Sequence, residues 1–357
     1  MKVLLLGAGG FVGSHLAEAL IDHGEHSVIG VDINSDKLAG IDGPMFGFVY
    51  ADARSDFDTI AELIADTDVA VDLISYAHPS IYVDRPREVF DLNFQANLAV
   101  LEQCADTGTR LIQYSTSEIY GKPSGLTYRE DESALVMGPV TKQRWIYASA
   151  KQLLERVVHA YGLEGRLTYT ILRPFNFLGS RLDYLVPAGA RGGPRVFAHF
   201  MSALLAGGPM YLVDGGHVHR SFTHIDDANQ AFLTILEHPK ATNQIFNIGN
   251  PSIDVSIREF AEIMCEVYED LTGAAPDCRL VEIEGEEFYG EGYQDTNRVV
   301  PDIEKIRSLG WEPRRDLRTA VTDAMRYYLD PAHQTLGSHW TSGDSVSSLE
   351  HRSSELG

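Results

Sequence analysis

A tyrosine and a lysine four residues apart have the types and spacing of a general-base pair. The phenol of Tyr147 and the ammonium of Lys151 stand at positions i and i+4, which share one face of a helix. An unperturbed tyrosine has a pKa of about 10, so we expect the Lys151 cation to lower the pKa of Tyr147 and make it a base near neutral pH. The pair alone is a weak signal, because such spacings also arise by chance on helix surfaces.

Two hydroxyl groups stand after an apolar run upstream of this pair. Residues 111–114 are typical of a buried strand, and Thr116 and Ser117 follow it closely. Doubly wound parallel sheets bind their ligands at the carboxyl ends of the strands. We therefore expect both hydroxyls at a ligand-binding edge of the sheet.

A glycine-rich segment, GAGGFVG at 7–13, links the first strand-like run to a helical pattern. Gly7 permits a tight turn, Gly10 lets backbone N–H groups approach a pyrophosphate, and Gly13 lets the helix pack against the sheet. Phe11 and Val12 begin the helix, whose N-terminus carries the positive end of its dipole toward the phosphates. This loop predicts a dinucleotide site.

Two acidic residues select the dinucleotide. Asp32 ends the next strand-like run, where a carboxylate accepts hydrogen bonds from a ribose diol and repels a 2′-phosphate, which favours NAD over NADP. Asp52 follows the third apolar run, and we expect it to meet the adenine amino group. The predicted cofactor is NAD.

Strand-like and helical segments alternate along the first half of the chain. This alternation predicts an α/β fold, a Rossmann-type doubly wound parallel sheet with a smaller mixed α/β substrate domain. We expect an NAD-binding domain from 1–175 with 221–250, a substrate domain from 176–220 with 251–330, and a disordered tail from 331–357. The strand candidates are 3–6, 27–32, 69–74, 111–114 and 169–172, and the clearest helical patterns are 13–22, 59–63, 89–107 and 145–161.

The composition of the 357 residues excludes several classes of protein. With 29 Lys+Arg against 51 Asp+Glu, the net charge of −22 repels phosphate, so neither nucleic acid nor a membrane surface is an expected partner. Three cysteines are too few and too scattered for a disulfide framework, and no apolar run approaches the ~20 residues of a membrane span. We expect a soluble cytoplasmic protein.

We also expect chemistry that needs no metal ion. Four histidines lack the spacing of metal ligands: His78, His217, His219 and His224.

Five further segments carry a resemblance to a known family. With the glycine loop and the Tyr147/Lys151 pair, they resemble the nucleotide-sugar branch of the extended short-chain dehydrogenase/reductases. Within that branch they are similar to the UDP-glucuronate decarboxylases, in particular the dehydrogenase domain of the bacterial enzyme that begins aminoarabinose synthesis for lipid A. The resemblance implies NAD-linked oxidation at C4 of UDP-glucuronate, followed by loss of the C6 carboxylate. The segments are 115–121, 138–147, 173–179, 214–220 and 289–295.

The resemblance implies a role for each matching residue. Tyr147 would be the base at the C4 hydroxyl, and Lys151 would lower its pKa and hold the nicotinamide ribose. Glu118 would accept a proton and Arg298 would donate one. The other matches are expected to contact the sugar nucleotide: Ala77, Tyr82, Thr116, Ser117, Arg144, Asn176, Arg181, Asp214, Arg220 and Tyr293.

The implied chemistry accounts for these residue types. A C4 ketone lies β to the carboxylate, and such acids lose CO₂ through an enolate, so the site must bind a carboxylate, stabilise the C4 oxygen and protonate C5. Arginine suits both the carboxylate and the diphosphate. The residue types alone leave purely structural roles open: Glu118 could cap a helix, Arg298 could form a surface ion pair, and Arg144 could cover a helix end.

Other activities also stay open at this stage. Return of the hydride to C4 would give UDP-xylose, and a 4-epimerase or 4,6-dehydratase would release no CO₂. A non-enzymatic dinucleotide sensor is disfavoured by the intact Tyr147/Lys151 pair. By the same resemblance we expect a homodimer formed through the helices 89–107 and 145–161. We also expect a local positive pocket in this acidic chain, formed by Arg144, Lys151, Arg220 and Arg298.

Overall fold

The centre of the computed structural model, which describes residues 1–122, 124–296, 298 and 300–335, is a seven-stranded sheet. Each neighbouring pair of strands in it is parallel. The strand order reverses between the fourth and fifth positions, which is where sheets of this kind bind ligands. In spatial order the strands are β12 (Gln244–Ile248), β7 (Tyr169–Pro174), β5 (Arg110–Tyr114), β4 (Val69–Asp72), β1 (Lys2–Leu6), β2 (Ser27–Asp32) and β3 (Phe46–Tyr50).

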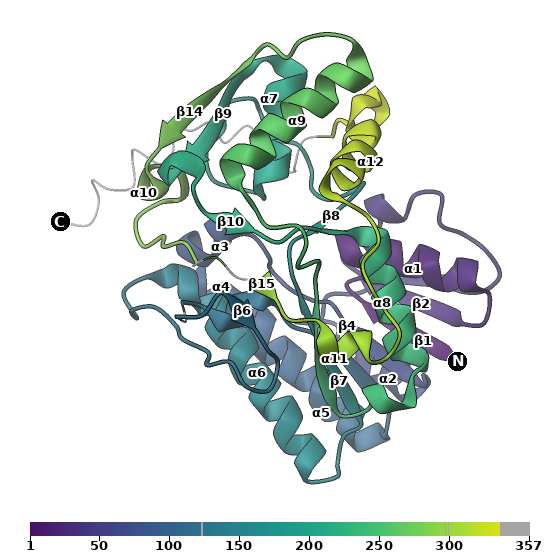
Figure 1. Ribbon diagram of the computed structural model, residues 1–357. Coiled ribbons are helices and arrows are strands. Elements are labelled where there is room, and N and C mark those ends of the chain that lie inside the picture. Colours follow the sequence, from purple (N-terminus) through teal and green to yellow (C-terminus); the bar gives the residue numbers. More distant parts are fainter. Residues whose placement is uncertain (123, 297, 299, 336–357) are drawn as a thin grey trace.

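Helices cover both faces of this sheet (Figure 1). Val3 and Leu5 of β1 pack into one hydrophobic cluster, whereas Leu4 and Leu6 pack into another, and all four are fully buried. A strand that is apolar on both sides is typical of a covered parallel sheet. The first cluster includes α1 (Phe11–His23) and α8 (Ile225–Glu237), and the second includes α2 (Phe57–Ala65), α5 (Asn97–Thr107) and α6 (Ile146–Leu163). The predicted Rossmann-type fold class is confirmed.

The helix predicted over 89–107 contains a π-helical turn that its periodicity does not reveal. The structure has α4 (Pro86–Phe90), the π-helical η2 (Asp91–Ala96) and then α5. The turn places the buried Asn93 so that its side chain accepts from the Tyr76 N–H at 2.9 Å and donates to the Ser75 hydroxyl at 3.1 Å. Because π-turns widen a helix locally, Asn93 can fasten the loop after β4. That loop lines the ligand-binding edge.

A second group of elements lies beyond the carboxyl edge of the sheet, at the top of Figure 1. Its two-stranded parallel sheet joins β9 to β14, and its helices share a hydrophobic cluster with α1 and α8. These elements are α7 (Val196–Ala206), β9 (Gly208–Val213), η5 (Asp214–Gly216), β10 (His219–Arg220), β13 (Val255–Ser256), α9 (Ile257–Thr272), β14 (Cys278–Ile283), α10 (Gly285–Tyr289) and α12 (Leu317–Leu329).

Part of the predicted substrate domain lies against the large sheet instead. β15 (Val300–Pro301) pairs with β6 (Thr127–Tyr128), and α11 (Glu304–Arg307) contacts β12. Of the predicted tail, Pro331–His333 form η7 and the Thr335 carbonyl accepts from the Leu185 N–H, while 336–357 lie outside the described residues.

Within the described part of the chain, no helix is long and apolar enough to cross a membrane. The remaining short elements are η1 (Asp36–Leu38), α3 (Pro79–Asp84), η3 (Ser117–Tyr120), η4 (Gln143–Trp145), β8 (Phe177–Leu178), β11 (Thr223–His224) and η6 (Pro239–Ala241).

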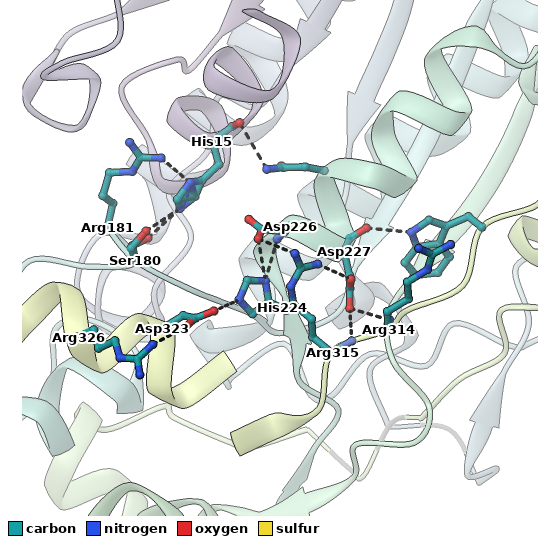
Figure 2. A network of polar contacts seen from close by, with 12 residues as sticks. His15, Ser180, Arg181, His224, Asp226, Asp227, Arg314, Arg315, Asp323 and Arg326 are labelled. Carbon is teal, nitrogen blue, oxygen red and sulfur yellow. Dashed lines mark hydrogen bonds and ion pairs between the residues drawn. The ribbon is translucent and has the colours of Figure 1, made fainter. Parts of the chain in front are cut away.

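A polar network joins α8 to its neighbours (Figure 2). Asp227, in the first turn of α8, is only 3% exposed, and its Oδ2 accepts from the backbone N–H groups of Arg314 and Arg315 at 2.9 Å each. Its Oδ1 accepts from the Arg315 guanidinium, also at 2.9 Å. His224 caps the same helix, accepting from Asp226 N–H, and its Nε2 lies 3.2 Å from Asp323 of α12. The network therefore fixes two parts of the chain to α8, which covers the large sheet. One is the segment between α11 and α12, and the other is α12 itself.

We expect Asp227→Ala to lower the free energy of unfolding by about 2–4 kcal/mol, because it leaves two backbone N–H groups and a guanidinium without their shared acceptor. Urea denaturation followed by circular dichroism measures this loss. Asp227→Asn, which keeps one acceptor oxygen, should lose less. Equal stability of Asp227→Ala and the wild type would show that the network does not hold the fold together.

Candidate active site

The glycine loop leaves no room for side chains at two of its positions. A Cβ on Gly13 would lie 2.2 Å from the Gly7 carbonyl oxygen, and one on Gly9 would lie 1.8 Å from the Asn34 oxygen. Gly7 itself has a φ of +88°, which an L-residue rarely adopts. At Gly10, the N-cap of α1, no side chain caps the helix, so its first N–H groups can receive a phosphate. The loop therefore matches the predicted dinucleotide cradle.

Asp32 lies at the carboxyl end of β2, directly behind this loop. Its carboxylate accepts from the Gly9 N–H at 2.9 Å and from the Asn34 N–H at 3.1 Å. Burial raises the pKa of Asp32, although these hydrogen bonds act against that shift. Asp52 is instead paired with Arg54 at 2.7 Å, which lowers its pKa. The ribose contact of Asp32 and the adenine contact of Asp52 both stay predictions.

A cavity of about 460 Å³ opens between the carboxyl edge of the sheet and the second group of elements. It begins at the glycine loop and continues past the end of β5 to β10 and α10. Most of the sequence-predicted residues line it, although they come from distant parts of the chain. They are Gly7, Gly10, Phe11, Val12, Gly13, Ala77, Tyr82, Thr116, Ser117, Glu118, Arg144, Tyr147, Lys151, Asn176, Arg220 and Tyr293.

Tyr147 and Lys151 both face this cavity from α6, as predicted, but their electrostatics differ from the prediction. Burial raises the pKa of Tyr147 to about 12, the Glu118 charge adds to that rise, and the hydroxyls of Thr116 and Ser75 partly offset it. The Lys151 ammonium is buried and donates to the Tyr114 carbonyl at 3.1 Å. Lys151 is not among the largest causes of this shift, so the structure shows the pKa of Tyr147 raised, and its lowering by Lys151 stays a prediction.

The phenol ring of Tyr147 is held by a second tyrosine. Tyr82 of α3 stacks on it with 4.7 Å between ring centroids and 6° between ring planes, and Tyr82 is almost fully buried. Such close aromatic contact restricts the Tyr147 ring to one orientation. Tyr82, predicted to bind substrate, therefore also positions the predicted base.

Glu118 and Arg144 form an ion pair in the cavity wall. Arg144 Nη1 donates to Glu118 Oε2 at 2.7 Å, and the Arg144 side chain is only 3% exposed. Burial by itself would lower the pKa of the Arg144 guanidinium, but the attraction of Glu118 outweighs it and raises that pKa. Thr116 fixes the turn that carries Glu118, because its Oγ1 accepts from the Glu118 N–H at 3.1 Å. Glu118, the predicted proton acceptor, and Arg144, a predicted substrate-binding residue, are therefore bound to each other and do not act independently.

A second ion pair lies deeper toward α10. Arg220 donates to Asp295 at 2.5 Å, and although burial opposes it, the charges of Arg220 and Arg144 hold the pKa of Asp295 below its usual value. Tyr289 and Tyr293 stack beside this pair with 4.4 Å between centroids. The arrangement offers a cation and a flat aromatic surface, which suits an anionic ligand attached to a ring.

Besides Asp32 and Asp52, three predicted site residues lie outside the cavity lining. Arg298 is 45% exposed and pairs with Asp254, so the structure does not bring it to Tyr147, and its role as a proton donor stays a prediction. Arg181 forms an ion pair with Glu18 and contacts the His15 ring; Figure 2 shows the contact with His15. Asp214 accepts from the Gly285 N–H at 2.8 Å and thereby holds the start of α10.

Sequence reasoning missed Arg195 and Asp183, which line the cavity as a bidentate pair at 2.7 and 3.0 Å. Lys37, also in the lining, has its pKa lowered to about 8 by burial. The only sequence signal for Arg195 and Asp183 was the Gly-, Pro- and Arg-rich composition of the loop 176–198. The lining cations outnumber the lining acids, so the local positive pocket is present, with Lys37 and Arg195 in place of Arg298. The cations are Lys37, Arg144, Lys151, Arg195 and Arg220, and the acids are Glu118, Asp183 and Asp295.

A doubly wound sheet with this loop, an acid after β2 and a tyrosine and lysine in the pocket defines an NAD-dependent enzyme of the dehydrogenase type. The chain belongs to the NAD-dependent epimerase/dehydratase family, whose model matches residues 3–249. The predicted membership in the nucleotide-sugar branch and the predicted cofactor, NAD, are confirmed.

Relatives match almost the whole chain. A UDP-D-apiose/UDP-D-xylose synthase of Oryza sativa subsp. japonica is 37% identical over 354 residues, which cover 92% of this chain and 89% of that protein. The crystal structure of the PbgP3 protein from Burkholderia pseudomallei has a TM-score of 0.81 and 35% identity, covering 92% of this chain and 96% of that one. The structure of a UDP-glucuronic acid 4-epimerase from Bacillus cereus, with a TM-score of 0.75 and 22% identity over 92% of this chain and 98% of that one, shares the fold.

Two alanine variants separate cofactor binding from folding. Gly10→Ala adds a methyl group that meets only the Gly7 oxygen at 3.2 Å but takes space in the cavity. We expect it to keep the wild-type stability and to weaken NAD binding about tenfold or more. Gly13→Ala should instead lower the free energy of unfolding by about 1–3 kcal/mol through overpacking. Calorimetric titration with NAD and urea denaturation measure the two effects, and identical behaviour of the two variants would contradict this division of roles.

Proposed function

We propose that this enzyme oxidises UDP-glucuronate at C4 and then releases its C6 carboxylate as CO₂, giving a UDP-4-keto-pentose. The observation that carries the proposal is the meeting of Tyr147 with two arginines, the buried Arg144 and the half-buried Arg220, in one cavity. A substrate with a diphosphate and a carboxylate requires two separate anion-binding groups, and the predicted base lies in the same cavity. The two UDP-sugar synthases and the UDP-glucuronate decarboxylase resemblance support the same substrate class.

The residues that fit NAD are those of the glycine loop and α1, with Asp32 at the ribose and Lys151 at the nicotinamide ribose. When bound, NAD accepts a hydride from C4. Tyr147 would take the C4 hydroxyl proton as the hydride leaves. Because burial raises the pKa of Tyr147 to about 12, the phenol is protonated at neutral pH in the chain by itself. A cation brought close to its oxygen would lower that pKa, and Lys151, four residues along the same helix α6, is the proposed cation.

The decarboxylation step breaks the C5–C6 bond and leaves its electron pair on C5 and the C4 oxygen. The Tyr147 phenol, reprotonated by the preceding step, and the Thr116 hydroxyl can donate hydrogen bonds to that oxygen. Arg144 would orient the carboxylate before it leaves, which requires that it share or release its bond to Glu118. After CO₂ leaves, C5 would take up one proton, relayed from solvent through Glu118, and the C4 oxygen would become a ketone again.

A second candidate product follows from the comparisons. The rice and Arabidopsis relatives are named UDP-apiose/UDP-xylose synthases, and in such a reaction the hydride returns to the sugar. The same cavity residues would serve both outcomes up to the loss of CO₂. The proposals differ only in whether the 4-keto sugar leaves before it is reduced.

One assay separates these activities. The enzyme is incubated with UDP-glucuronate and NAD, and released CO₂ and NADH absorbance are followed together. We expect CO₂ with an equal amount of NADH, because the 4-keto-pentose is released. CO₂ without NADH would establish the UDP-pentose synthase, and neither product would overturn both decarboxylase proposals in favour of a 4-epimerase or 4,6-dehydratase.

Matched variants test the two ion pairs. Glu118→Gln keeps the shape and a hydrogen bond to Arg144 but cannot exchange the proton, so turnover should fall roughly 10²–10⁴-fold with unchanged NAD affinity. Asp295→Asn removes the partner of Arg220 instead, and it should change KM for the sugar nucleotide more than kcat. Steady-state kinetics and NAD titration measure both. An unchanged turnover in Glu118→Gln would remove Glu118 from the mechanism.

We also propose a homodimer formed through the helices 89–107 and 145–161. Leu153 of α6, a large apolar side chain that is 46% exposed, supports this interface.

A further inference from the structure

Three potential metal ligands gather at the end of the molecule opposite the cavity. His23 is the last residue of α1, His26 stands just before β2, and Glu237 is the last residue of α8. The glycine loop lies at the other end of α1, and thirteen residues of helix span roughly 20 Å. The cluster is therefore separate from the active site. Figure 1 shows α1 and α8 side by side, and their packing in one hydrophobic cluster agrees with this view.

Two of the three distances between the ligand atoms of the cluster are close to those of a tetrahedral site. His23 Nε2 lies 3.3 Å from Glu237 Oε1, and His26 Nε2 lies 3.7 Å from the same oxygen. One potential ligand atom from each of the three residues lies within 4.8 Å of the others. Metal–ligand bonds of about 2.0–2.2 Å at tetrahedral angles place ligand atoms roughly 3.3–3.6 Å apart. Closing the site requires only small rotations of side chains.

His26 has an unusual environment for a histidine with no ligand. Its side chain is 3% exposed, and within the described residues neither ring nitrogen makes a hydrogen bond. A buried polar group without a partner is costly, and such groups in native proteins generally have one.

We propose that His23, His26 and Glu237 bind one divalent transition-metal ion, Zn²⁺, with water in the fourth position. Two imidazoles and a carboxylate are a donor set that zinc uses with one position open. The exposed fractions of His23 and Glu237, 30% and 45%, leave that position and the entry path accessible to solvent. The bound ion supplies the missing partner of His26. It fastens the end of α8 to the end of α1 and to the turn at Gly24, so its role is to stabilise the fold and not to take part in the reaction.

Zinc binding to the untagged chain tests this site. Equilibrium dialysis against ZnCl₂ after chelator treatment should give one bound ion per chain, and added zinc should raise the temperature of unfolding. Cobalt(II) in place of zinc should show the intense visible bands of a tetrahedral site. No zinc binding by the wild type, or no effect of zinc on its unfolding temperature, overturns the proposal and leaves an ion pair only.

Variants at the two exposed ligands show where the ion binds. His23→Gln and Glu237→Gln should each weaken zinc binding about tenfold or more and abolish the thermal shift, while both keep wild-type activity in chelator, which shows that they are folded. His217→Gln, which removes an exposed histidine outside the cluster, should bind zinc as the wild type does. Wild-type affinity in either ligand variant, or equal loss in the control, overturns the assignment.

Discussion

Each arginine among the described residues that line the cavity is paired with a carboxylate, and the site of this acidic chain depends on that constraint. A guanidinium taken out of water without a partner costs several kcal/mol, so Arg144 must be held by Glu118 and Arg220 by Asp295. The same rule operates behind the cavity, where Arg173 meets Glu155 at 2.7 Å with both side chains almost fully buried. These ion pairs hold the arginines in place at the cavity of a protein whose net charge is −22.

Paired arginines also shape how an anionic substrate can be bound. A diphosphate or carboxylate entering the cavity must compete with Glu118 or Asp295 for the same guanidinium groups. Part of the binding energy is then used to rearrange these pairs, which favours ligands that carry two anions over ligands with one. In the proposed mechanism, Glu118 released from Arg144 would be free to exchange a proton. Substrate binding and proton transfer would then be coupled through one ion pair.

Local sequence patterns predicted the elements well wherever burial repeats with a fixed period. The strand 27–32 matches β2 residue for residue, and α6 extends the predicted 145–161 only slightly, because both bury one side against the sheet. The π-turn η2 was not foreseen, since Asn93 owes its position to the loop 74–76 and not to helical periodicity. Arg298 was placed in the site by its motif, yet Asp254 holds it outside the cavity lining. The partner of Asp52, Arg54, was likewise invisible to a pattern that considered only the dinucleotide.

The sequence by itself determined the cofactor loop, the Tyr147/Lys151 pair and the alternation of strands and helices, because backbone sterics and hydrophobic periodicity act over a few neighbouring residues. The tertiary structure alone decided which charges meet. Glu118 and Arg144, Arg220 and Asp295, and His26 and Glu237 are distant along the chain, and their contacts depend on how loops approach one another at the two ends of the sheet. It also decided that burial, more than the neighbouring lysine, governs the pKa of Tyr147. Long-range approach and desolvation are properties of the folded molecule, and no local spacing encodes them.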